Sequence, residues 1–325
     1  MKIAGSCLHV LLIAAGCLFA APVLAQQWPA RAVRIIVPFP PGQAADIIAR
    51  AIAERLSPAI GQQVFIDNRP GAAGSIGTEL AAKAPPDGYT LLAGGSSALA
   101  INPHLYPKLT YNTLRDFAPV TQIVAIAMVF VVNPALPVRN LNDFIALAKR
   151  RPGELNYGSS GPGSTSHLVT ATLAARAGFT LNHVPYKGAV QSLTDLIAGE
   201  LSLVAETPTT VIAHVQSQKL RAVAISMNRR IPQLPDVATV DEQGIRGYDL
   251  STWTSLVAPA ETPPAILDRL NSEIVKIIAQ PEMQKRLFDM GFIPVGNSRE
   301  QFGAFLKAEH AGWAKIVQES GAKVE

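Results

Sequence analysis

The chain has 325 residues, of which 48% are hydrophobic and 16% are charged, and its formal net charge at pH 7 is +4. The basic clusters Lys149–Arg151 and Arg229–Arg230 have no aromatic residues among them, so the charge pattern does not indicate nucleic-acid binding. The length allows one large or two medium domains, and the alternation of strand-like and helix-like stretches predicts an α/β protein.

The first residues have the pattern of an export signal. Lys2 precedes an apolar run at Val10–Ala21, and Val23–Ala25 has the small residues of a cleavage site. The apolar run is too short for a typical transmembrane helix. We therefore expect cleavage after Ala25 and an exported, soluble protein.

Both cysteines, Cys7 and Cys17, lie in this leader. The mature chain would therefore have no disulfide, no cysteine-ligated zinc and no cysteine nucleophile. The residues before Cys17 resemble a lipoprotein cleavage box only weakly, because Ala14 stands where a larger aliphatic residue is usual, so lipid attachment stays open.

The stretch Val33–Arg50 predicts a buried strand, a Pro/Gly loop and an amphipathic helix. A loop that enters a helix in this way directs backbone N–H groups out of the helix start and can bind an anion. Because Pro40 and Pro41 have no N–H, the expected donors are those of Gly42, Gln43, Ala44 and Ala45.

Two similar units follow the first. Gln63–Asn68 predicts a strand that enters a Gly-rich turn, and Thr90 begins a strand that ends in a Gly/Ser loop with Ser96 and Ser97. The glycines of the turn do not form the GxGxxG dinucleotide fingerprint, so we expect no such cofactor. Three strand–loop–helix units in succession predict a parallel sheet whose ligands bind at the carboxyl ends of the strands.

The apolar run Val120–Pro134 is longer than an average strand, and we expect it to pass from one sheet into another. A helix follows, with Asn140 or Asn142 as its N-cap and Pro152–Gly153 at its end. Strands are also expected at Lys219–Ser226 and Ser255–Pro259. Helices are predicted over Pro264–Ala279, Glu282–Met290 and Glu300 to about Glu319.

A second Gly/Ser-rich loop lies within Leu155–Gly178, where a short strand ends and a helix begins near Ser164. The stretch Leu181–Glu200 repeats this pattern, and a further strand ends at Glu206. These loops offer backbone donors and hydroxyls with few formal charges, which suits anion recognition without an ion pair.

Catalytic and metal-binding patterns are weak. Ser164 and His167 share a helix face, and Glu206 or Asp195 would complete a triad, but no GxSxG elbow surrounds the serine. The histidines form neither HxH nor HExxH, so no metal site is predicted. Lys187 lies in a loop, so it is better interpreted as a surface charge or a ligand contact than as a Schiff-base lysine.

Taken together, the motifs resemble the tripartite tricarboxylate transporter receptor family, the "Bug" group of periplasmic solute-binding proteins. The resemblance covers essentially all of the mature chain in order. It is carried by VRIIVPFPPG, DNRPGAAGSIG, PPDGYTLL, INPHLY, DFAPV, NYGSSGPGSTSHL, HVPYKGA, TDLIAGE and LPDVATVDEQGIRGYDLSTWTSLVAPAETP.

The resemblance implies an α/β periplasmic binding protein of the type II-like Venus-flytrap fold, with two crossing hinge strands. Residues 26–122 and 252–325 would form domain I and residues 123–251 domain II, with crossings near Val120–Val124 and Leu250–Ser255. It implies no enzyme activity and no cofactor. The expected partners of this monomer are a small organic carboxylate and the membrane subunits of a tripartite tricarboxylate-type transporter.

By position, the resemblance also implies the residues that bind the ligand. Asp46 is expected to support its loop by accepting hydrogen bonds from loop amides. Gln43 replaces a usual glycine and Glu206 a usual aspartate, and both changes leave the identity of the carboxylate open. The full expected set is Phe39, Pro41, Gly42, Gln43, Ala44, Asp46, Ser96, Ser97, Ser160, Gly161, Gly163, Ser164, Thr165, His167, Tyr186, Lys187, Gly188, Ala189 and Glu206.

Two alternatives to a transport receptor remain at this point. One is a sensor that presents a carboxylate to a signalling partner, which the sequence does not distinguish from a transport receptor. The other is a secreted hydrolase that uses Ser164 and His167.

Overall fold

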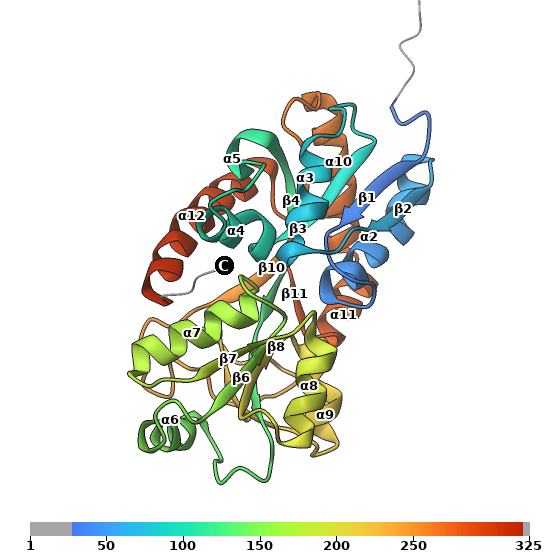
Figure 1. Cartoon of the computed structure of the whole chain (residues 1–325). Coiled ribbons are helices and arrows are strands. Elements are labelled where there is room, and N and C mark those ends of the chain that lie inside the picture. The colour runs from blue at the N-terminus through green and yellow to red at the C-terminus, as the bar shows by residue number, and fades with distance from the viewer. Residues whose placement is uncertain (1–27, 321–325) are drawn as a thin grey trace, which may run out of the picture.

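The computed structural model describes residues 28–320. The expected export signal, with its cleavage after Ala25 and the possible lipid site at Cys17, lies outside the described residues. The described chain forms two lobes, each built on one β-sheet with helices on its faces (Figure 1). We call the part on the six-stranded sheet lobe I and the part on the five-stranded sheet lobe II.

The sheet of lobe I has the strand order β11-β4-β10-β3-β1-β2. Strands β1, β2 and β3 run parallel, as the three strand–loop–helix units predict, whereas β10 runs antiparallel to β3 and β4. The strands are β1 (Val33–Val37), β2 (Val64–Asn68), β3 (Thr90–Gly95), β4 (Phe117–Ala127), β10 (Ser251–Pro259) and β11 (Phe292–Pro294).

The helices of lobe I cover both faces of this sheet. Helix α2 (Ala44–Ile60) buries Ile48, Ile52 and Leu56 against it and ends at Gly61, whose left-handed backbone lets its N–H bond to the Ser57 carbonyl. The other α-helices are α3 (Ser75–Ala82), α4 (Asn102–Leu105), α5 (Thr113–Asp116), α10 (Pro264–Ala279), α11 (Pro281–Asp289) and α12 (Arg299–Ser320). Short helical turns cover η2 (Ala72–Gly74) and η3 (Ser97–Ile101).

The sheet of lobe II has the strand order β7-β6-β8-β5-β9, with β6 parallel to β7 and β8. Asn140 caps α6 as expected, because its side chain accepts the N–H of Asp143. The strands are β5 (Val129–Val132), β6 (Asn156–Ser159), β7 (Asn182–Pro185), β8 (Leu203–Glu206) and β9 (Arg221–Ile225). The helices are α6 (Leu141–Arg150), α7 (Thr165–Ala177), α8 (Ala189–Ala198) and α9 (Pro208–Gln216).

Two segments connect the lobes. The first is the long apolar run, which changes sheet at Met128: Ala127 pairs with Ser251 in lobe I, and Val129 pairs with Glu206 in lobe II. This change lies beyond the expected crossing at Val120–Val124, because β10 pairs with β4 along its whole length. The second segment enters lobe I at the start of β10, within the expected range.

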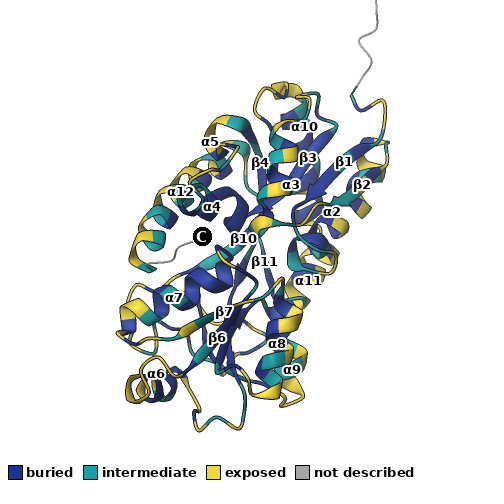
Figure 2. Ribbon diagram, viewed as in Figure 1, coloured by how far each residue is buried: buried dark blue, intermediate teal, exposed yellow. Residues whose placement is uncertain are grey.

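The buried residues extend from one lobe into the other (Figure 2). One hydrophobic cluster contains Phe130 of lobe II together with Trp253 and Phe302 of lobe I. Helix α12 packs against α7 of lobe II as well as against β4 and η3 of lobe I. Within residues 28–320, no helix is long and apolar enough to cross a membrane.

Candidate functional site

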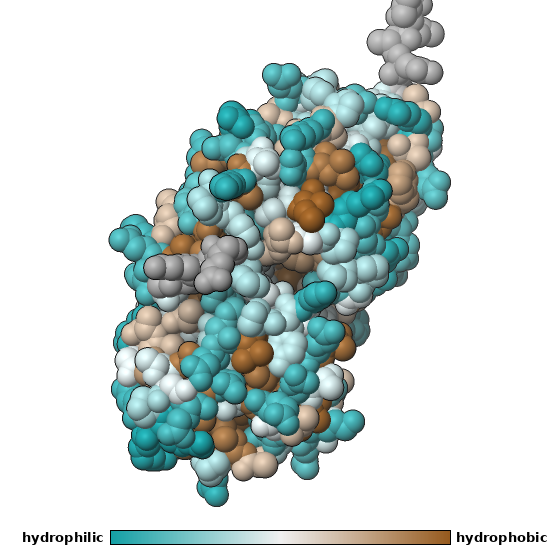
Figure 3. All heavy atoms as spheres, in the orientation of Figure 1, coloured by the Kyte–Doolittle hydropathy of each residue, from teal (hydrophilic) through white to brown (hydrophobic). Residues whose placement is uncertain are grey.

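A pocket of about 110 Å³ lies where the two lobes meet. This volume is below the roughly 300–1,000 Å³ of pockets for drug-sized ligands, so the pocket suits a smaller molecule. The surface is hollowed between the lobes on a face that is otherwise mostly hydrophilic (Figure 3). The lining residues are Phe39, Gln43, Ala44, Ala45, Gly95, Ser96, Ser97, Ile126, Met128, Ser160, Ser164, Thr165, Ser166, Ala189, Glu206, Thr207, Thr210, Thr252, Trp253 and Thr254.

The loop before α2 forms part of the lobe I wall. Gln43 precedes the helix in an extended conformation, and Ala44 and Ala45 begin the helix at the pocket. The expectation of a free donor at Gly42 is wrong, because the Gly42 N–H donates to Asp46 Oδ2 at 2.9 Å. Asp46, four residues later in α2, accepts this N–H, and Gly42 itself lies outside the pocket lining.

Asp46 stabilises this loop through hydrogen bonds, as the sequence predicts. Its buried carboxylate accepts hydrogen bonds from Gly42, from the Asn68 amide at 2.9 Å and from the Arg50 guanidinium at 3.0 Å. Burial alone would raise the pKa of Asp46, but the hydrogen bonds from Arg50, Gly42 and Asn68 outweigh it and hold the pKa below its usual value. Asp46 is therefore ionised at neutral pH, and its carboxylate is already hydrogen-bonded to Gly42, Asn68 and Arg50.

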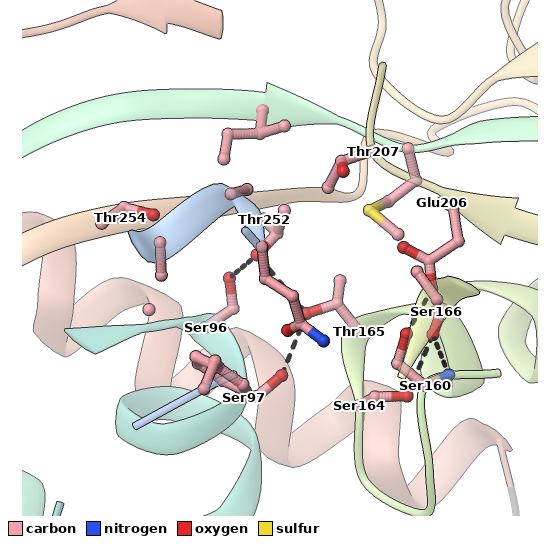
Figure 4. Close-up of a pocket in the computed structure, with 18 of the residues that line it drawn as sticks. Ser96, Ser97, Ser160, Ser164, Thr165, Ser166, Glu206, Thr207, Thr252 and Thr254 are labelled. Carbon is pink, nitrogen blue, oxygen red and sulfur yellow. Dashed lines mark hydrogen bonds between the residues drawn. The ribbon is translucent and has the colours of Figure 1, made fainter. Parts of the chain in front are cut away.

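Hydroxyl groups from three elements meet at the back of the pocket (Figure 4). The Ser96 hydroxyl donates to Thr252 Oγ1 at 3.0 Å, and Thr165 Oγ1 lies 3.4 Å from the same atom. Ser97 Oγ lies 3.3 Å from Thr165 Oγ1. This chain joins the end of β3, the start of α7 and strand β10, so it connects the two lobes at the site.

The loop before α7 forms the opposite wall. Ser164 caps the helix: its Oγ accepts the His167 N–H at 3.2 Å and donates to the Gly161 carbonyl at 2.6 Å. The N–H groups expected as donors at Gly161 and Gly163 are instead bonded within the loop, to Ser159 Oγ and to His167 Nδ1. The loop therefore presents hydroxyls and the helix start to the pocket, and not its glycine amides.

Glu206 is the only ionisable side chain in the pocket lining of the described chain. It ends β8 immediately before α9 and is 5% exposed. The Ser160 hydroxyl donates to its Oε1. Burial raises the pKa of Glu206 to about 7, although hydrogen bonds from Ser160, Thr207 and Ser166 oppose this rise.

Ten of the nineteen residues expected to bind a ligand line this pocket, and nine do not. His167 faces away and stacks on His183, with ring centroids 4.0 Å apart. The Tyr186 hydroxyl donates to Asp195 at 2.6 Å, and the Lys187 side chain is exposed. The residues outside the lining are Pro41, Gly42, Asp46, Gly161, Gly163, His167, Tyr186, Lys187 and Gly188.

The expected set of binding residues lacks ten residues of the lining. Three of them, Thr252–Thr254, lie on the crossing strand β10, and two more, Thr207 and Thr210, lie at the start of α9. Because Thr207 and Thr210 closely follow Glu206 in the sequence, the predicted strand end at Glu206 is a signal that could have identified them as pocket residues. The others are Ala45, expected above only as a backbone donor, and Gly95, Ile126, Met128 and Ser166.

The lobes touch around the pocket. The Tyr106 hydroxyl of lobe I donates to the Pro162 carbonyl of lobe II at 3.2 Å. Arg176 and Glu319 form an ion pair at 3.1 Å between α7 and α12. A Cβ atom on Gly163 would lie 2.8 Å from the Leu105 side chain of lobe I, so a larger residue here would displace Leu105 or push the lobes apart. The structure therefore brings the two walls together around a small pocket.

The proposed hydrolase machinery is not assembled. The Ser164 hydroxyl bonds to a backbone carbonyl and caps α7, while Nδ1 of the His167 ring accepts the N–H of Gly163. Glu206 bonds to Ser160 and not to a histidine. Burial and the neighbouring His183 lower the pKa of His167 to about 3. Within residues 28–320, no group of three or more His, Cys, Asp or Glu residues could hold a metal ion.

We expect Ser164→Ala to lower stability by about 1 kcal/mol, because α7 loses its N-cap. The variant should not change the rate at which the protein hydrolyses p-nitrophenyl acetate, since Ser164 has no base beside it. Urea unfolding and an ester assay on both proteins measure the two effects. Ester turnover by the wild type that disappears in the variant would restore the hydrolase interpretation.

The chain was compared with known families and structures. A sequence model described as the tripartite tricarboxylate transporter family receptor matches residues 48–322. The chain belongs to this receptor family. Protein BugT of Bordetella pertussis is 38% identical to it, over 94% of this chain and 94% of BugT.

Solved structures of similar proteins have the same fold. Rpa4515 of R. palustris, solved with adipate, superimposes with a TM-score of 0.87 at 34% identity, covering 91% of this chain and 100% of its own. The periplasmic binding protein BugD gives 0.84 at 30% identity, covering 92% and 100%. MatC from Rhodopseudomonas palustris, with bound malate, gives 0.82 at 28% identity, covering 89% and 100%. The predicted family and the periplasmic-binding fold are thus confirmed.

Proposed function

We propose that this receptor captures a small organic carboxylate between its two lobes in the periplasm and, as a monomer, delivers it to the membrane subunits of a tripartite tricarboxylate-type transporter. Removal of the export signal after Ala25 belongs to this proposal. In it, residues 26–122 and 252–325 form one domain and residues 123–251 the other, and the change of sheet at Met128 favours moving the first boundary to that residue.

One observation carries the proposal: four α-helices of the described chain begin at the pocket wall. They are α2 at Ala44, α7 at Thr165, α8 at Ala189 and α9 at Pro208, whose neighbour Thr207 lines the pocket. The N-terminus of a helix carries unpaired N–H groups and about half a positive charge, so it favours an anion. Convergence of four such ends provides positive potential where no lysine, arginine or histidine lines the pocket.

The solved relatives support a carboxylate as the anion. Rpa4515 was solved with adipate and MatC with malate, and both are small dicarboxylates. In this chain the hydroxyls of Ser97, Thr165 and Thr252 lie beside the helix starts and can donate to carboxylate oxygens. We propose the ten lining residues of the expected set as direct ligand contacts. Asp46, Gly163 and His167 would then act by holding the loops in place.

Organic acids should stabilise the mature protein. A ligand present at one hundred times its dissociation constant adds about 2.7 kcal/mol to the free energy of unfolding. A thermal-shift panel of monocarboxylates, dicarboxylates, tricarboxylates and amino acids, with chloride and sulfate as controls, tests this expectation. The proposal fails if none of the organic acids raises the melting temperature.

A further inference from the structure

Glu206 has no cationic partner in the site it occupies. Its carboxyl group is 5% exposed and is held by the hydroxyls of Ser160 and Ser166 and by the N–H of Thr207. No lysine, arginine or histidine lines the pocket in residues 28–320. Burying a carboxylate costs free energy unless a positive group pairs with it. The residues that line the pocket do not supply this positive group.

The elements packed around Glu206 do not supply that charge either. On α7 and β7, burial lowers the pKa of His167 to about 3 and that of His183 to about 4, and a neighbouring charge contributes only at His167. Both rings are therefore neutral near pH 7. Tyr157 on β6 has its pKa raised well above the neutral range by burial, and on α8 the carboxylate of Asp195 accepts the hydroxyl of Tyr186.

The two parts of the pocket wall thus have opposite preferences. The helix starts and the hydroxyls of Ser97, Thr165 and Thr252 favour a negative group. Glu206 favours a hydrogen-bond donor, and above all a cation. A second carboxylate beside Glu206 would meet a like charge in a water-poor site, where repulsion is stronger than in water.

We propose that Glu206 selects zwitterionic ligands, which carry an ammonium group to bind Glu206 in addition to the carboxylate that the helix starts hold. This inference rests on the proposed function and names the ligand class for the same pocket. The ligand supplies the cation that the protein lacks, and Glu206 supplies the discrimination against diacids of equal length.

The charge of Glu206 gives the two ligand classes opposite pH dependence. Because burial raises the pKa of this group to about 7, it is mostly protonated at pH 6 and mostly ionised at pH 8. A ligand that requires the ionised form should bind about tenfold more tightly at pH 8 than at pH 6. A diacid that requires the protonated form should bind about tenfold more tightly at pH 6.

Matched pairs of ligands test the proposal by isothermal titration calorimetry at both pH values. Succinate, glutarate and adipate are each compared with the amino acid in which an ammonium replaces one carboxylate: 3-aminopropanoate, 4-aminobutanoate and 5-aminopentanoate. Malate is compared with aspartate, which has an ammonium in place of the hydroxyl. The proteins are the wild type, Glu206→Gln and the control Glu200→Gln, which removes one carboxylate from an exposed position six residues away.

At pH 8 we expect at least one ammonium ligand to bind wild type and Glu200→Gln at least tenfold more tightly than its partner. Glu206→Gln should reduce this ratio to within threefold and abolish both pH slopes. The inference is overturned if the diacids or malate bind wild type as tightly as their partners at pH 8, or if Glu206→Gln keeps the preference. If Glu206→Gln does not fold, the opposite pH slopes of the wild type decide the question. Absence of binding by every acid in the panel would overturn the proposed function itself.

Discussion

Replacing Gly163 by valine is expected to weaken ligand binding strongly while both lobes stay folded. Gly163 has φ +76°, and a Cβ atom there would lie 2.8 Å from Leu105 and 3.3 Å from Tyr106 of the opposite lobe. Valine adds two further methyl groups to this contact. Overpacking of this kind costs about 1–3 kcal/mol, and the left-handed backbone adds about 1–2 kcal/mol. The overpacking opposes contact between the lobes, so this part of the cost should weaken binding by about 5- to 150-fold.

The matched control is Gly178→Val at the other end of the same helix. Gly178 has φ +68°, but a Cβ atom added there would meet no other atom within 4 Å, so this variant has the backbone strain without the contact between lobes. Both variants should therefore lose about 1–2 kcal/mol to backbone strain in urea unfolding, and only Gly163→Val should lose affinity in calorimetry with the tightest acid of the panel. Equal affinity of the two variants would show that this loop contact does not limit binding.

Asp46→Ala is expected to destabilise the protein. The substitution leaves the Gly42 N–H and the Asn68 amide without their acceptor and removes the ion pair with Arg50. Because Arg50 is half exposed, solvent reduces the contribution of the ion pair, and we expect a total loss of about 2–3 kcal/mol. The same change releases the loop before α2, so ligand affinity should fall as well.

The pH dependence of this loss has a defined sign. The folded-state pKa of Asp46 lies below that of an aspartate in an unfolded chain, so its contribution is fully present above the unfolded pKa and is lost as the pH falls through the folded pKa. Urea unfolding of wild type and Asp46→Ala should thus differ most at neutral pH and converge as the pH falls through the folded-state pKa of Asp46. Glu282→Ala, which breaks an exposed ion pair with Arg55, should cost less than about 0.5 kcal/mol. If Asp46→Ala and Glu282→Ala lost similar free energy of unfolding, this would contradict the role of Asp46 in stabilising the loop.

Local patterns in the sequence predict the elements of this fold well. The strand–loop–helix units at Val33–Arg50 and Leu155–Gly178 and the helix at Pro264–Ala279 occur where the periodicity places them. Short elements without a periodic pattern, such as α5 and β11, were missed. The strand β11 has only three residues and exists because β4 offers it an edge, which is a long-range condition that local sequence does not contain.

The site is less predictable because its geometry depends on competition for donors. Gly42 and Gly163 have the residue type of an anion-binding loop, yet their N–H groups bond to Asp46 and to His167. His167 shares a helix face with Ser164, but stacking on His183 turns its ring away from the pocket. Thr252 reaches the pocket from a crossing strand far along the chain, so only the folded arrangement reveals it.

The four helix starts at the pocket also bear on how capture responds to salt. Charges on exposed lysines and arginines are screened by dissolved ions within about 10 Å at 0.1 M ionic strength. Backbone dipoles at a pocket between two lobes are partly buried, so dissolved ions screen them less than they screen exposed charges. A receptor built in this way should change its affinity little between dilute and saline surroundings.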